Sequence, residues 1–211
     1  DPNTGIVFRR VDLPESVEIG ARVDHVVRAN RGTSLAIGEI HIHTIEHLMA
    51  VFLALGIDNC VVELDEEEIP LMDGSSKLFV EAIQSVGIVR QTAPARILWI
   101  REPLHLTDGD RMLIALPSSD FHVSETVVFP DPAVGTQYAN FRITPEEFSA
   151  AIAHARTFGF VSDADELRRQ GMIKGASLEN AVVYENGKLL SGPLRFPDEP
   201  VRHKILDLMG D

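Results

Sequence analysis

The chain has 211 residues, of which 45% are hydrophobic and 24% are charged, and a net charge of −13. This balance is typical of a folded protein with one large domain or two small ones, and it excludes disorder and collagen-like repeats. The acidic excess would repel a phosphate backbone, so we expect no nucleic-acid partner, while a local basic pocket for a small phosphorylated ligand stays compatible with it.

The first half predicts strands followed by helix, strand and helix. Two or three strands are expected between Gly5 and Glu39, where β-branched residues cluster. A helix is expected from Thr44 to Leu55 with Gly56 as its stop, followed by a strand from Asp58 to Leu64. A second helix is expected from about Ser76 to Val86.

Three local features of the first half have simple interpretations. The longest apolar stretch, Leu48 to Ile57, is about half of the ~20 residues that a membrane span needs, so none is expected. The single cysteine, Cys60, excludes internal disulfides and predicts a small core residue of a cytoplasmic protein. The segment Met72–Ser76 predicts a tight turn at Asp-Gly, with Ser75 or Ser76 capping the next helix.

The second half repeats the order of the first after a linker at Gln91–Ala95. A helix is expected to begin at Thr144, with Thr as N-cap and Pro145 in the first position. The other expected elements are strands at Arg96–Arg101, Arg111–Leu116, His122–Phe129 and Ala181–Tyr184, and helices from about Ala164 and from Glu199. The repetition predicts an α+β fold of two similar domains, residues 1–92 and 93–211.

The first candidate site is the segment His43-Thr44-Ile45-Glu46-His47 at the start of an apolar helix. If Glu46 and His47 are enclosed, a nearby cation must offset the cost of the buried carboxylate. The same pattern is equally consistent with Glu46 and His47 lying on a narrow, solvent-exposed stripe of the helix. The spacing also matches the inverted zinc-protease signature H-x-x-E-H, in which His43 and His47 bind zinc and Glu46 is the base.

The second candidate site is on the final helix, where His203, Asp207 and Asp211 fall within about 80° of one another. An imidazole and a carboxylate one turn apart can share a metal ion. Spacing alone favours the simpler interpretation of an amphipathic helix with a solvated His–Asp pair. The opposite, apolar face of that helix comprises Val201, Ile205, Leu208 and Met209.

The third candidate is Thr157, which stands between Arg156 and the sequence Phe158-Gly159-Phe160. A hydroxyl in this position can donate a hydrogen bond to an oxyanion. The same residues also form a run of high β-propensity that packs two phenylalanines, and the motif alone does not decide between these interpretations.

Taken together, these segments resemble the UDP-3-O-acyl-N-acetylglucosamine deacetylases, zinc amidases of lipid A biosynthesis in Gram-negative bacteria. They follow one another in family order along the whole chain. The matching stretches are Asn3–Arg10, Thr44–Leu48, Leu55–Asn59, Glu68–Ser75, Ala155–Phe160, Lys174–Leu178, Leu194–Phe196 and Val201–Asp211. The resemblance implies a β-α-α-β sandwich of two similar two-layer domains.

The resemblance also implies the roles of single residues. His47, His203 and Asp207 look like three ligands of Zn²⁺, which leave one coordination position for water, as a catalytic zinc requires. Glu46, next to a ligand, looks like the general base for that water. The reaction implied is removal of the N-acetyl group from an acylated UDP-amino sugar, with release of acetate.

Further residues match family positions around the substrate. Thr157 and Lys204 look like the groups that stabilise the oxyanion, and Asp211 looks like an acidic orienting residue. The acyl chain is expected in an apolar passage near Phe158, Gly159, Phe160 and the segment after Ser162, with Lys204 also binding substrate. The implied partner is this small molecule, and the protein is expected to be a monomer.

The chain departs from the family pattern in several places. It resembles a fragment truncated at both ends, without the Gly-His pair whose histidine is the family's general acid. Asp131 stands where many members have His, Ala176 replaces a common glycine, and His43 occupies a position that is usually small and polar. The alternatives are therefore an inverted-motif zinc metalloprotease with His43 as a ligand, or a catalytically incomplete fragment that binds a nucleotide sugar.

Overall fold

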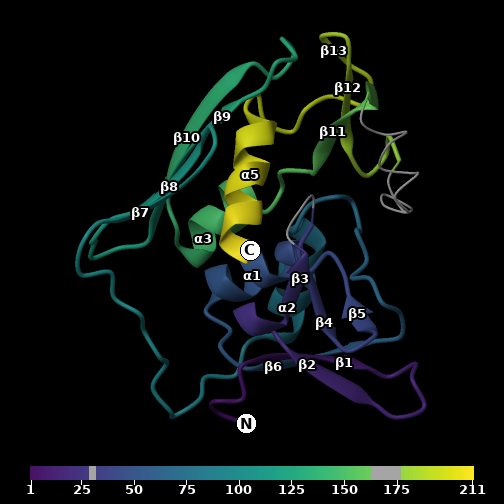
Figure 1. The fold of residues 1–211 in the computed structure, drawn as a ribbon, viewed down its shortest axis with the longest axis vertical. Helices are drawn as coiled ribbons and strands as arrows, with labels where there is room; N and C mark the ends of the chain where they lie inside the picture. The colour runs from purple at the N-terminus through teal and green to yellow at the C-terminus, as the bar shows by residue number, and fades with distance from the viewer. Residues whose placement is uncertain (29–31, 163–176) are drawn as a thin grey trace.

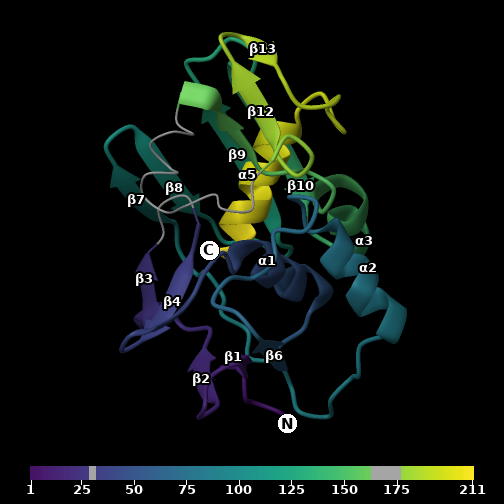
Figure 2. The same cartoon turned by 90° about the vertical axis from the view of Figure 1, so that its right-hand side faces the viewer.

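The structure is a computed structural model that describes residues 1–28, 32–162 and 177–211. In two perpendicular views, the sheet of β1 (Ile6–Arg10), β2 (Val17–Gly20) and β6 (Cys60–Leu64) lies at one end (Figures 1 and 2). Helices α1 (Glu46–Leu55) and α2 (Lys77–Val86) lie next to it, and α5 (Glu199–Gly210) lies beyond them. The helix expected from about Ala164, the motif residues 174–176 and the segment after Ser162 lie outside the described residues.

The first half contains two three-stranded sheets. In the first, β1 is central, antiparallel to β2 and parallel to β6; these strands are Ile6–Arg10, Val17–Gly20 and Cys60–Leu64. In the second, β3, β4 and β5 are joined as an antiparallel meander; they are Val26–Arg28, Ser34–Ile37 and Ile40–Ile42. The strands predicted before Glu39 are confirmed, and they are more numerous than expected. Cys60 is only partly buried against the first-half core.

The second half contains two hairpins and a small mixed sheet. The hairpins pair β7 with β8 and β9 with β10; these strands are Leu104–Asp108, Arg111–Ala115, His122–Val128 and Thr136–Arg142. In the mixed sheet β12 is central; the strands β11, β12 and β13 are Phe158–Phe160, Val182–Glu185 and Lys188–Leu189.

One strand prediction in the second half is wrong, and the strands β7 and β10 were missed. Residues Arg96–Arg101 form an irregular segment in which Leu98 is 90% exposed, and none of the described strands pairs with it to complete a hydrogen-bonded ladder. The strand β10 was not predicted, although it pairs with β9 along its whole length.

The helices begin and end close to the predicted residues. They are α1, Glu46–Leu55; α2, Lys77–Val86; α3, Pro145–Glu147, which continues as a π-helix over Phe148–Ile152; and α5, Glu199–Gly210. Gly56 ends α1 in the left-handed conformation at φ 68°, as predicted for a C-terminal glycine. The Thr144 hydroxyl accepts a hydrogen bond from the Glu147 amide, which confirms the predicted N-cap.

Helix α1 is buried on two faces, which explains why its sequence is apolar all round. One face, with Leu48 and Phe52, packs into a core built from the first-half sheets. The other face, with Ala50 and Val51, packs into a core that α5 and the β9–β10 hairpin also line. The second core therefore joins the two halves of the chain, and it brings the start of α1 next to α5.

The observed architecture is α+β, as expected. Among the described residues, no helix combines the length and the apolar character needed to cross a membrane.

Candidate active site

His47, His203 and Asp207 meet where α1 and α5 pack against each other at the centre of the molecule (Figure 1). One donor atom from each residue lies within 4.8 Å of the others. The two imidazole rings have centroids 4.9 Å apart and stand nearly perpendicular. The Asp207 Oδ1 atom lies 3.3 Å from Nε2 of His203 and 3.7 Å from Nε2 of His47. The structure thus brings together three residues that the sequence separates by up to 160 positions.

These side chains are enclosed and not solvated. Glu46 is 6% exposed, His47 4% and His203 2%. The interpretation of His203 and Asp207 as a solvated pair is therefore wrong, and so is that of Glu46 and His47 as a solvated stripe. The reason is that α1 covers the face of α5 that carries His203. Leu208, which was expected on the buried apolar face of α5, is exposed instead.

A backbone carbonyl orients the ring of His203, and a serine hydroxyl fixes the backbone of His47. The Nδ1 atom of His203 lies 3.0 Å from the carbonyl oxygen of Ala155, so a proton on Nδ1 leaves Nε2 as the lone-pair nitrogen facing Asp207. The Ser76 hydroxyl donates a hydrogen bond of 2.8 Å to the carbonyl oxygen of His47. Ser76 thereby anchors α2 to α1, while the Ser75 hydroxyl accepts from the Lys77 amide at the start of α2.

The protonation states favour binding of a divalent cation. Burial, together with the neighbouring His203, lowers the pKa of His47 to about 4, so its imidazole is neutral at pH 7. Burial opposes ionisation of Asp207, but His203, Lys204 and His47 hold the pKa of this carboxyl below its usual range. A metal ion binds neutral imidazoles and ionised carboxylates, so these protonation states are the ones that ligation requires.

The donor set itself fits zinc. Two imidazoles and one carboxylate are the ligand types of catalytic zinc sites with an open position. The Nδ1 atom of His47 is also buried with no hydrogen-bond partner in the described part of the chain. The imidazole nitrogen of His47 nearest to Asp207 is Nε2, so the donor that this residue offers to the cluster is Nε2 and not the unpartnered Nδ1.

Glu46 has the environment of a proton-transfer group. Burial is the main reason that its pKa is raised to about 7, and the nearby carboxyls of Asp207 and Asp211 add to the effect. Its Oε2 atom accepts a hydrogen bond of 2.9 Å from the backbone amide of Thr33. A base whose pKa lies near the working pH can both accept and return a proton.

Three other predicted residues, Lys204, Asp211 and Phe158, lie near this cluster at different distances from it. The ammonium group of Lys204 donates to Oδ2 of Asp207 at 2.8 Å, and this ion pair raises the pKa of Lys204 against the effect of burial. Asp211 accepts a hydrogen bond from the hydroxyl of Thr33, and burial raises its pKa. The ring of Phe158 has its centroid 6.3 Å from that of His203.

The segment with Thr157 is fixed by its backbone. The Thr157 amide donates to the carbonyl of Gly74 at 2.7 Å, and the Thr157 carbonyl accepts from Val182 at 2.8 Å. Gly159 and Phe160 follow in β11, where the ring of Phe160 packs near those of Phe158, Phe129 and Tyr184. The two hydrogen bonds of Thr157 fix its backbone, and neither of them involves its hydroxyl.

His43 lies apart from the cluster, as expected from its unusual family position. Its Nδ1 atom is 2.8 Å from the hydroxyl of Ser34, and its ring stacks on that of His41. The inverted-protease hypothesis needs His43 as a ligand beside His47, and this geometry does not favour it.

Comparison with known proteins places the chain in one family. The family described as UDP-3-O-acyl N-acetylglycosamine deacetylase matches residues 1–211. The chain belongs to this family. Relatives named UDP-3-O-acyl-N-acetylglucosamine deacetylase include one from Myxococcus xanthus, 43% identical over 100% of this chain and 67% of the relative. Others come from Chlamydia abortus, 45% identical over 99% of this chain and 75% of the relative, and Thermosynechococcus vestitus, 41% identical over 99% and 73%.

Four residues that shape this candidate site were not singled out from the sequence. Thr33 and the carbonyl of Ala155 contact Glu46 and His203, and they have no distinctive residue type. Ser76 was interpreted only as a helix cap. Glu199, the first residue of α5, carried a weak signal, because an acidic residue is common there, but its complete burial was not foreseeable.

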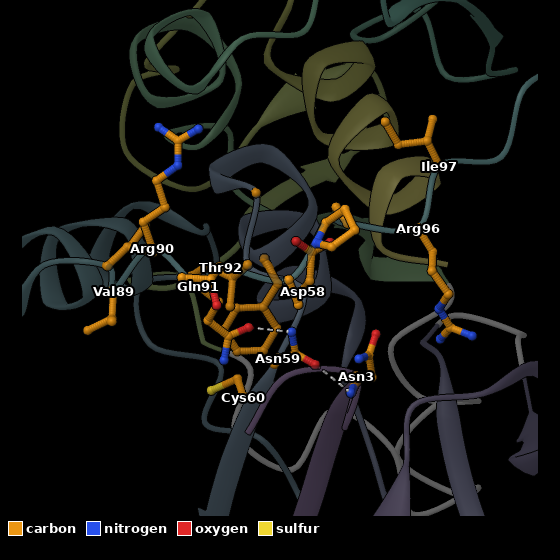
Figure 3. A pocket seen from close by; sticks show the side chains of 18 of the residues that line it. Asn3, Asp58, Asn59, Cys60, Val89, Arg90, Gln91, Thr92, Arg96 and Ile97 are labelled. Carbon is orange, nitrogen blue, oxygen red and sulfur yellow. Dashed lines mark hydrogen bonds between the residues drawn. The ribbon is translucent and has the colours of Figure 1, made fainter.

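A separate hollow of about 1420 Å³ lies at the other end of α1. The linker residues Arg90 and Gln91 line it together with Asn59 and Cys60 (Figure 3). The side-chain amide of Asn59 donates to the Gln91 oxygen, and the Asn59 oxygen accepts from the Gly5 amide, so these contacts hold the linker to β1. The hollow contains none of the deacetylase residues described above.

Proposed function

We propose that the chain is a zinc-dependent hydrolase that removes the N-acetyl group from UDP-3-O-acyl-N-acetylglucosamine and releases acetate, the committed step of lipid A biosynthesis. Family membership and the names of the relatives support this substrate. The observation that carries the metal dependence is the buried convergence of His47, His203 and Asp207. We propose these three residues as the zinc ligands.

Zinc in this position would act as a Lewis acid on the acetamide carbonyl and make water a stronger nucleophile. Glu46 takes the proton from the attacking water, a role that suits a buried carboxylate directly beside the proposed ligand His47. A C–O bond forms at the carbonyl carbon, and the C–N bond then breaks to give acetate. The amine nitrogen must gain a proton to leave, and Glu46 can return to it the proton taken from the water.

The remaining roles concern charge and position. The Thr157 hydroxyl and the Lys204 ammonium group stabilise the oxyanion that forms during attack. Lys204 is suited to this role because its charge is maintained by Asp207. Asp211 orients this end of α5, and Phe158, Gly159 and Phe160 line the passage for the acyl chain. The aromatic packing of Phe158 and Phe160 supports an apolar passage here.

We also propose that residues 1–92 and 93–211 are two domains of a β-α-α-β sandwich and that the protein is a monomer. The support is that each half has its own sheets, and that α1 and α5 pack together between them (Figure 2).

Metal analysis of purified variants tests the site. We expect about one zinc per chain in the unmodified protein and in His43→Ala, and loss of zinc together with deacetylation in His203→Ala. Glu46→Gln should keep zinc and lose about 10²–10⁴-fold in rate. His43→Ala is the matched control, since it removes a nearby histidine outside the cluster. Zinc retained by His203→Ala, or lost from His43→Ala, would overturn the proposed ligand set.

A further inference from the structure

Thr33, just before β4, contacts both helices that carry the proposed catalytic residues. Its carbonyl oxygen accepts from the backbone amide of Ile45 at 3.2 Å, at the start of α1. Its own amide donates to Oε2 of Glu46 at 2.9 Å, and its hydroxyl donates to Oδ1 of Asp211 at 2.5 Å. Thr33 is 3% exposed. One small residue thus joins a strand, the first turn of α1 and the residue that follows α5.

The amide of Thr33 determines which oxygen of Glu46 remains for chemistry. A carboxylate that accepts from a backbone amide is held at that oxygen, because the amide cannot rotate away. Oε2 is engaged in this way, which leaves Oε1 as the oxygen that Thr33 does not bind. Gly32 lies on the side of Oε1, since a Cβ built on this glycine would be 3.4 Å from that oxygen.

The hydroxyl of Thr33 determines where that amide lies. Asp211 holds the hydroxyl, and Asp211 follows directly on Gly210, whose backbone packs against the carbonyl of Glu46. The hydrogen bond therefore fixes Thr33 to the same part of α5 that touches α1. Without the hydroxyl, the amide of Thr33 loses its tie to α5, and the carboxylate of Glu46 loses its fixed orientation.

We infer that Thr33 is a positioning residue for Glu46, acting through its backbone amide and held in place by Asp211. This inference rests on the proposed role of Glu46 as the base. A displacement of about 1 Å in a reacting group can cost on the order of 10²-fold in rate, so the loss of this support should affect turnover more than substrate binding.

The test compares Thr33→Val and Thr33→Ala, which lose the hydroxyl but keep the amide, with Thr33→Ser, which keeps both. We expect kcat to fall by about 10-fold to 100-fold in the first two with KM within about twofold, and Thr33→Ser to recover most of the loss. Zinc content should be unchanged in the variants, and they should stay folded at the assay temperature although loss of the buried hydrogen bond lowers their unfolding temperature. Thr107→Val, on the exposed strand β7, is the control and should behave as the unmodified protein.

A double variant tests the link to Asp211. Adding Thr33→Val to Asp211→Ala should lower kcat no further, because both changes remove the same hydrogen bond. Fully multiplicative losses, or unchanged kcat in folded Thr33→Val and Thr33→Ala, would overturn the inference. Glu46→Gln in the same assay separates the two proposals. If it retains normal kcat, the proposed role of Glu46 fails; if it is inactive while Thr33→Val is fully active, only the inference about Thr33 fails.

Discussion

The buried ion pair between Glu199 and Arg156 predicts a large loss of stability when one partner is removed. Glu199 has no exposed surface, and Arg156 is 7% exposed. The carboxylate accepts four hydrogen bonds: from the amide, Nε and Nη2 of Arg156 at 3.0, 2.8 and 3.1 Å, and from the amide of Arg195 at 2.7 Å. The pair fixes the first turn of α5 to the segment that precedes Thr157.

The magnitude follows from what each variant leaves behind. Glu199→Ala leaves the guanidinium of Arg156 buried without a counter-charge, which costs about 3–5 kcal/mol of unfolding free energy. Glu199→Gln keeps the shape but replaces a charged acceptor of hydrogen bonds, and we expect a loss of about 1.5–3 kcal/mol. These losses are large compared with a total stability of about 5–15 kcal/mol.

Urea denaturation followed by circular dichroism measures these losses. Glu63→Gln is the matched control, because Glu63 pairs with Arg9 at the surface and should contribute only about 0–1 kcal/mol. Although burial opposes ionisation of Glu199, hydrogen bonds from Arg156 hold its pKa below the usual range. Its contribution is therefore complete above the ordinary glutamate pKa and is lost as the pH falls through the lowered value. A loss below about 1 kcal/mol for Glu199→Ala at pH 7 would refute the reasoning.

Two further predictions concern the contact between α1 and α5 and the proposed metal. Gly210→Ala should lower the unfolding temperature and weaken zinc binding, because the added Cβ would overlap the carbonyl group of Glu46; Gly192→Ala, where a Cβ meets open space, is the control for a thermal melt. Removal of zinc with a chelator should lower stability by about 2.7 kcal/mol relative to protein in zinc at 100 times its Kd, and His203→Ala should show no such dependence in calorimetry.

The helices were predictable because their signals are local. The Thr-Pro start at Thr144 and the glycine stop at Gly56 act within one turn, and both are confirmed. The strand predicted at Arg96–Arg101 was wrong because β-propensity describes a residue's fit to a sheet and does not supply the neighbouring strand. For the same reason β10 was missed, although its pairing with β9 is extensive.

The candidate site was predictable in residue identity but not in environment. The spacing of His203 and Asp207 places them on one face of a helix, and the structure agrees. Spacing does not show whether that face meets water or another helix, and this is why the solvated interpretation failed. The hydrogen bond from Thr33 to Asp211 joins residues 178 positions apart, and the sequence around either residue does not predict it.

The charges at the contact between α1 and α5 explain why these side chains need one another. Glu46, Asp207 and Asp211 bring three carboxyls into a buried region, and Lys204 is the basic side chain that directly pairs with them there. Repulsion between the carboxyls helps to raise the pKa of Glu46 and Asp211, so without a further cation part of the negative charge is neutralised by protons. A divalent cation held by His47, His203 and Asp207 would replace those protons, which couples the acidity of Glu46 to occupancy of the metal site. The packing of the two halves and the chemistry of the site therefore depend on the same small set of buried charges.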